Sequence, residues 1–233
     1  MTIRILKRHL QLRRFHPSIG PFSSSSSSSS KPVTLTQDEL TKINLLLPRL
    51  CLSNHLNTAT HLAITALLTN PPPNSLSLSA LLDSLASQPD MARPMSLLTR
   101  LRHAPLSHCQ VAPITATLVA AYFKKGKARE ALKVFNWMVR PGSPWELEER
   151  VCGVLVSGFC RNGMVLEALK VLRAMAAANV EPRGGLRKLL YRGLLREARV
   201  REAMELNAAL EFDCDEGRKK AFELLDRMIE NWS

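Results

Sequence analysis

The sequence predicts an all-α fold in which antiparallel helix hairpins stack side by side and one further helix follows the last hairpin. Composition is the first reason: hydrophobic residues make up 45% of the 233 residues but aromatic residues only 5%. A core rich in Leu and Ala favours helices over strands. The second reason is a recurring segment, which begins at Leu118, Leu155 and Leu190 and has the apolar spacing of two amphipathic helices.

The N-terminal segment, residues 1–31, has the composition of a targeting signal. It carries six Lys or Arg, no acidic residue and eight consecutive serines, Ser23 to Ser30. Such a segment is typical of an organelle transit peptide that is removed after import. The early arginines favour a mitochondrial destination, and the serine run keeps the chloroplast as the alternative. A basic arm that binds nucleic acid directly is the other interpretation, and the net charge of +12 fits a polyanionic partner in either case.

Three copies of one pattern carry the prediction of a repeat array. Each copy has an apolar stripe, a turn and a second stripe that opens with Glu-Ala-Leu or Glu-Ala-Met. Gly126 and Gly163 mark the turn in the first two copies, and Ala198 takes that place in the third. The copies are LVAAYFKKGKAREALKVFNWM (118–138), LVSGFCRNGMVLEALKVLRAM (155–175) and LYRGLLREARVREAMELNAAL (190–210). A single hairpin cannot bury both of its stripes, so neighbouring copies must stack.

The remaining segments extend this array in both directions. Upstream, fainter units at about 40–74 and 75–109 lack the glycine turn and are separated by three prolines, which interrupt any helix. Downstream, a lone apolar stripe in KKAFELLDRMIENWS predicts a capping helix. We therefore expect a leader and Ser-rich linker (1–31), degenerate helical repeats (32–111), three repeats within 112–210 (112–146, 149–183 and 184–210) and a C-terminal capping helix (211–233).

The copies resemble pentatricopeptide repeats, most closely in LVSGFCRNGMVLEALKVLRAMAAANVEP, residues 155–182. With the leader, they resemble a short plant organellar member of the P-type subclass. The resemblance implies a right-handed α-solenoid whose first helices line a concave groove. It also implies that single-stranded RNA is read at about one base per repeat. The implied recognition pairs are Ala116 with Glu146 and Gly153 with Arg183, and neither Ala116 nor Gly153 has a side chain that forms hydrogen bonds.

Basic residues predict contact with phosphates. Lys124, Arg161 and Arg196 occupy equivalent positions near the ends of the three first helices. In the third copy, Lys188, Arg192, Arg196 and Arg199 follow helical spacing and predict a basic face on one helix. Ordinary solvated cations are the alternative interpretation of both sets. Neighbouring aromatic residues are suited to stack on bases, but their places in the apolar stripes favour core packing; they are Tyr122, Phe123 and Phe159.

No catalytic signature is present in the sequence. It lacks a metalloprotease, nucleotide-binding or zinc-deaminase motif, so we expect no enzyme activity, no cofactor, no metal site and no small-molecule substrate. The five cysteines are irregularly placed and are expected to be reduced. No apolar run is long enough to span a membrane.

The expected function is organellar RNA binding in RNA processing, splicing or maturation. Three repeats read only about three bases, so we expect protein partners or a homodimer. The alternative is a protein-interaction scaffold, or a component associated with the organellar ribosome, that kept the fold without base readout. Three tryptophans are candidate anchors for such a scaffold, namely Trp137, Trp145 and Trp232.

Overall fold

A computed structural model describes residues 34–73, 75–141, 147–182, 184–210 and 215–232. The predicted leader, residues 1–31, lies outside the described residues. The described residues form eleven α-helices, one short 3-10 helix and no strand, which confirms the all-α prediction. The first helices of five hairpins are α2 (Gln37–Leu52), α4 (Ser79–Ser87), α6 (His108–Lys124), α8 (Glu149–Arg161) and α10 (Gly184–Arg196). The second helices are α3 (Leu56–Leu67), α5 (Ala92–Arg102), α7 (Ala128–Met138), α9 (Val165–Ala177) and α11 (Val200–Ala209).

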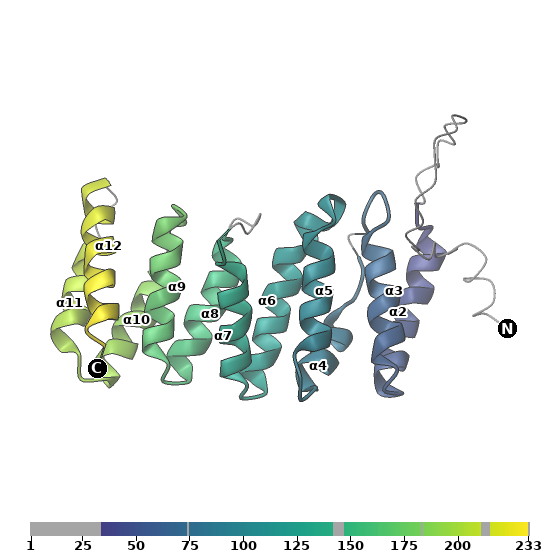
Figure 1. The fold of residues 1–233 in the computed structure, drawn as a ribbon, viewed down its shortest axis with the longest axis horizontal. Helices are drawn as coiled ribbons and strands as arrows, with labels where there is room; N and C mark the ends of the chain where they lie inside the picture. The colour runs from purple at the N-terminus through teal and green to yellow at the C-terminus, as the bar shows by residue number, and fades with distance from the viewer. Residues whose placement is uncertain (1–33, 74, 142–146, 183, 211–214, 233) are drawn as a thin grey trace, which may run out of the picture. The chain divides into compact units, whose positions relative to one another are not determined.

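The hairpins follow one another in chain order, from α2 and α3 to α10 and α11 (Figure 1). Each first helix contacts the first helix of the next hairpin, from α2 against α4 through α8 against α10. One buried core runs through all five hairpins and includes Leu47, Leu82, Leu118, Leu155 and Leu190. This continuous core is the arrangement of an α-solenoid, because each hairpin buries its apolar stripes against its neighbours.

One turn geometry joins the helices of most hairpins. In the two glycine turns, Gly126 and Gly163 have φ of 69° and 71°. In the next turn Ala198 has a φ of 57°, a left-handed conformation that glycine adopts without steric cost. The amide after each left-handed residue donates to the carbonyl five residues before it, as from Lys127 to Tyr122 at 2.9 Å. This bond pattern satisfies carbonyls at the helix end that otherwise have no partner.

The same turn occurs in the first degenerate hairpin, where the sequence has no glycine. Asn54 has a φ of 58°, and the His55 amide donates to the Leu50 carbonyl at 2.8 Å. This unit thus lacks a turn glycine, as its sequence indicates, but has the turn itself, with Asn54 in the place of glycine. Asn is the residue that most often replaces glycine in the left-handed region, and this preference was the signal available in the sequence.

Two lysines of the α6–α7 turn fasten that hairpin to the one before it. The ammonium group of Lys127 donates to three carbonyl oxygens at the end of α4, those of Ala86, Ser87 and Gln88, at 2.9, 3.1 and 2.7 Å. Lys125 forms an ion pair of 2.9 Å with Asp83 on the same helix. Although the sequence reads Lys-Lys-Gly-Lys at this turn, two of its three cations are therefore engaged in the junction between hairpins.

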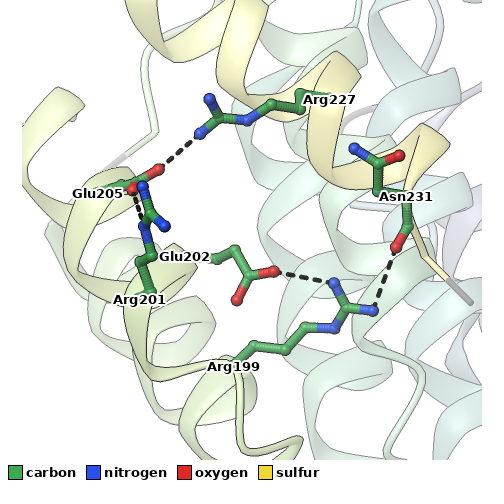
Figure 2. Close-up of polar contacts among 6 residues, drawn as sticks. All are labelled: Arg199, Arg201, Glu202, Glu205, Arg227 and Asn231. Carbon is green, nitrogen blue, oxygen red and sulfur yellow. Dashed lines mark hydrogen bonds and ion pairs between the residues drawn. The ribbon is translucent and has the colours of Figure 1, made fainter.

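The last helix, α12 (Asp215–Glu230), contacts the second helices of the final two hairpins, α9 and α11. On α9, Arg173 donates to Asp226 at 2.7 Å, and its guanidinium lies 4.6 Å from the centre of the Phe222 ring. On α11, Glu205 accepts a hydrogen bond from Arg227 at 2.6 Å (Figure 2). These contacts come from both neighbouring helices, so α12 holds the last two hairpins together.

Candidate nucleic-acid interface

The first helices α6, α8 and α10 line an open groove with a volume of about 1130 Å³. Its lining combines apolar side chains with three cations, Lys124, Arg150 and Arg161, and one carboxylate, Glu149. The apolar and small residues of the lining include Ala120, Phe123, Gly153, Val154, Ser157, Gly158, Leu186 and Leu189. The groove therefore has a largely apolar lining, and the charged side chains of that lining carry a net positive charge.

The predicted row of cations lies at the ends of three successive first helices. Lys124, Arg161 and Arg196 are the last residues of α6, α8 and α10, and all three are exposed. Lys124 and Arg161 line the groove directly. None of the three forms an ion pair or hydrogen bond with any residue that the structure describes. Their charges are therefore available to an anion that approaches from solvent.

The basic face of the third copy lies on α10, and its cations are not among the residues that line the groove. Lys188 and Arg192 are exposed on α10. They occupy the positions that Gly153 and Ser157 occupy on α8, and both of those residues line the groove. With Arg196, these two side chains form an exposed group of positive charges on α10, the first helix of the last hairpin.

The fourth residue of that predicted face, Arg199, belongs elsewhere. It follows the end of α10 and donates to Glu202 at 3.0 Å and to the Asn231 carbonyl at 3.4 Å (Figure 2). Its guanidinium also lies 4.2 Å from the centre of the Trp232 ring. The prediction that Arg199 lies on a basic face of one helix is wrong, because the turn ends the helix and redirects this side chain toward the C-terminal residues.

The implied base-recognition positions have little to offer a base edge. Ala116 is buried, with an exposed fraction of 4%, and Gly153 lines the groove without a side chain. Their implied partners, Glu146 and Arg183, lie outside the described residues. Within the described part of the interface, these two positions therefore supply shape and no side-chain hydrogen bond.

Two of the three candidate aromatic residues are core residues, as their apolar placement predicted. Tyr122 and Phe159 have exposed fractions of 1% and 0%. Burial, aided by the charges of Glu130 and Asp90, raises the pKa of the Tyr122 hydroxyl to about 12. Phe123 differs, because its ring is only partly buried and lines the groove. The expectation of core packing is therefore incomplete for Phe123.

The buried thiols fit a structural role. Burial raises the pKa of Cys152 to about 12 and that of Cys160 to about 11, so both are protonated at neutral pH and poor nucleophiles or metal ligands. Among the described residues, no group of three or more His, Cys, Asp or Glu is placed to hold a metal ion. No described helix has the length and apolar character needed to cross a membrane.

One groove cation was missed by the sequence analysis. Arg150 is exposed and lines the groove at the start of α8. The equivalent positions of the other two copies hold Pro113 and Gly185. A search for residues that recur at the repeat period cannot find a cation that occurs in one copy only.

The helix order and the continuous core define a helical-hairpin repeat protein of the α-solenoid class. Two family models, each described as a PPR repeat, match residues 116–142 and 153–176. The chain therefore contains two pentatricopeptide repeats, one on the second half of α6 with α7 and one on α8 with α9. Proteins of this family are generally non-catalytic RNA binders, which assigns the chain to the nucleic-acid-binding helical repeat proteins. No curated protein matches the chain.

Proposed function

We propose that this protein binds single-stranded RNA in the groove of α6, α8 and α10, and that it acts without catalysis in organellar RNA processing, splicing or maturation. The single observation that carries the proposal is the row formed by Lys124, Arg161 and Arg196. These cations end three successive first helices and have no protein partner among the described residues. A row of cations at the repeat spacing suits the regular charge of a phosphate backbone.

The experiment that tests this proposal changes the row to uncharged residues of similar length. RNA binding by the full chain is measured by fluorescence anisotropy at several salt concentrations, with a labelled single-stranded oligonucleotide. Each phosphate contact with a single strand contributes about 0.7 to the slope of log affinity against log salt. The variant that combines Lys124→Met, Arg161→Met and Arg196→Met should therefore lose affinity and reduce the slope by about 2.

The chain offers a matched control on its second helices. Arg129 and Lys133 on α7 and Lys170 on α9 are exposed, and none forms an ion pair or hydrogen bond within the described residues. Changing all three to Gln removes the same total charge from a different surface. Equal losses in both triple variants would show that overall charge, and not the groove, binds the RNA.

The cellular role extends this proposal. The basic leader with its serine run supports import into mitochondria, with the chloroplast as the alternative. The small number of repeats supports a role shared with protein partners or a second copy of the chain, since three bases recur too often to select one transcript. A crosslinked pull-down from purified mitochondria, followed by RNA sequencing and mass spectrometry, tests this role. One transcript region that survives high-salt washing is the expected result.

A protein-interaction scaffold is the second candidate, and exposed apolar side chains at the first and last hairpins favour it. On α2, Leu45 and Leu52 are 57% and 88% exposed, and near α11, Val200 and Met204 are 53% and 60% exposed. The proposed tryptophan anchors give less support. Trp137 is 8% exposed, so its interpretation as an anchor is wrong, and Trp145 lies outside the described residues. Protein partners that persist after nuclease treatment, with no RNA footprint, would favour the scaffold.

A further inference from the structure

The Phe123 ring occupies an unusual place at the junction of α6 and α8. Gly158 on α8 lies directly against it: a Cβ atom built on Gly158 would come within 2.2–2.4 Å of three consecutive ring atoms. A point that is nearly equidistant from three such atoms lies over the face of the ring. The Gly158 backbone therefore covers one face of Phe123, at a distance that no larger residue permits.

A second aromatic ring also contacts Phe123. Phe159, which is fully buried, meets Phe123 in an edge-to-face arrangement, with ring centres 5.2 Å apart and an angle of 88° between the planes. Edge-to-face contacts of this kind are favourable and directional. Phe123 is thus held by two neighbours while part of it stays exposed in the groove. An aromatic ring fixed in this way loses little side-chain entropy when a ligand contacts it.

The charges around the ring indicate which ligand it suits. Lys124 follows Phe123 directly, and Arg161 ends the facing helix on the same groove. An aromatic face beside cations is the combination with which proteins bind single-stranded nucleic acid without sequence preference, by stacking on bases and neutralising phosphates. The neighbouring recognition positions, Ala116 and Gly153, provide no side-chain hydrogen bond with which to select a base.

We propose that Phe123 is a stacking platform for one base of the bound RNA, and that it makes binding at the α6–α8 junction tolerant of base identity. This inference rests on the proposed RNA-binding function and specifies how that site holds its ligand. It assigns one platform only among the three copies. The equivalent residue of α8 is Cys160, which is 4% exposed and has no ring, and that of α10 is Leu195.

Oligonucleotides with and without bases separate stacking from charge. The full chain is titrated with labelled 12-nucleotide oligo(A), oligo(C) and oligo(U), and with an abasic strand of the same length. The wild type should bind the three base-containing strands within about 5-fold of one another. Phe123→Leu should weaken all three by at least about 5-fold. It should leave binding to the abasic strand and the salt dependence unchanged.

Two control variants keep the test decisive. Phe123→Tyr retains the aromatic face and should bind as the wild type does. Tyr122→Phe changes the adjacent ring, which is buried, and should leave RNA affinity unchanged. If wild-type protein binds none of the strands, the proposed function itself fails. If it binds them and Phe123→Leu weakens abasic and base-containing strands alike, the platform is refuted while RNA binding stands.

A further measurement tests the proposal on the wild-type chain, in case the Phe123→Leu variant does not fold. Oligonucleotides that carry one 5-iodouracil are crosslinked by light to the wild-type chain, and the attached peptide is identified by mass spectrometry. A base stacked on Phe123 should crosslink within the peptide that contains residue 123. Crosslinks confined to other parts of the chain would overturn the proposal.

Discussion

Replacing Lys127 with Met separates structural cations from the cations proposed to bind RNA within one turn. In the structure, the Lys127 ammonium donates three hydrogen bonds of 2.7 to 3.1 Å to the carbonyl end of α4. Met keeps the apolar stem and removes the charge and all three donors. The carbonyls of Ala86 and Gln88 are part-buried and lose a charged partner, whereas water replaces the bond to the exposed Ser87 carbonyl.

The expected loss follows from these contacts. A hydrogen bond that involves a charged group contributes about 1.5–3 kcal/mol, and a cation at a helix C-terminus about 0.3–1 kcal/mol. The three bonds share one ammonium and do not add, so we expect the free energy of unfolding to fall by about 2–3 kcal/mol. For a chain of this length, that corresponds to a decrease of about 4–12 °C in Tm.

Circular dichroism gives the Tm, and hydrogen exchange shows where stability is lost. In a repeat array each hairpin contacts only its neighbours, so amides of α4 should exchange faster while those of α9 keep their protection. Lys124→Met, three residues away, should leave the Tm within about 1 °C and weaken RNA binding instead. The assignment of these two roles is refuted if Lys127→Met preserves the Tm and the α4 exchange rates, or if it affects RNA binding as Lys124→Met does.

Three smaller changes test other parts of the fold. Ala198→Gly should raise the free energy of unfolding, measured by urea denaturation, by about 0.5–1 kcal/mol. The φ of 57° at this position costs a non-glycine residue about 1–2 kcal/mol. The greater chain entropy of glycine in the unfolded state offsets part of this gain. Tyr122→Phe should raise the free energy of unfolding by about 1 kcal/mol, since the Tyr122 hydroxyl is buried without a hydrogen-bond partner. A lower free energy of unfolding would instead reveal a partner for this hydroxyl. Gly158→Ala should displace the Phe123 ring, cost about 1–3 kcal/mol and weaken RNA binding as Phe123→Leu does; unchanged binding would contradict the ring's role.

Periodicity predicted the parts of the fold that repeat. The glutamates of the recurring Glu-Ala pair, Glu130, Glu167 and Glu202, each lie in the first turn of a second helix, where a carboxylate complements the helix dipole. A turn was predicted where glycine marks it, and the same turn at Asn54 was not identified, because two residue types meet the same backbone requirement.

Periodicity did not determine the direction in which the individual side chains of the site point. Tyr122 and Phe123 are adjacent aromatic residues in one apolar pattern, yet about 100° of helix rotation separates them, which places one in the core and the other in the groove. The same limit applies to Lys124 and Lys127. Their sequence context is equally basic, and only the position of the preceding hairpin determines that Lys127 meets the end of α4. Residues of this kind depend on the neighbouring repeat, which a pattern within one repeat does not contain.

The proposed binding mode separates affinity from selectivity. In it, the groove cations and the Phe123 ring act on features that every nucleotide shares, a phosphate and an aromatic face. A base edge is recognised only where a hydrogen-bonding side chain meets it, and Ala116 and Gly153 provide none at two of the four recognition positions that the family resemblance implies. We expect a preference for one transcript to arise from the shape of the RNA or from a bound partner. A partner that adds selectivity requires a surface outside the groove, and the exposed apolar residues of α2 and of the α10–α11 hairpin are of the kind that supplies one.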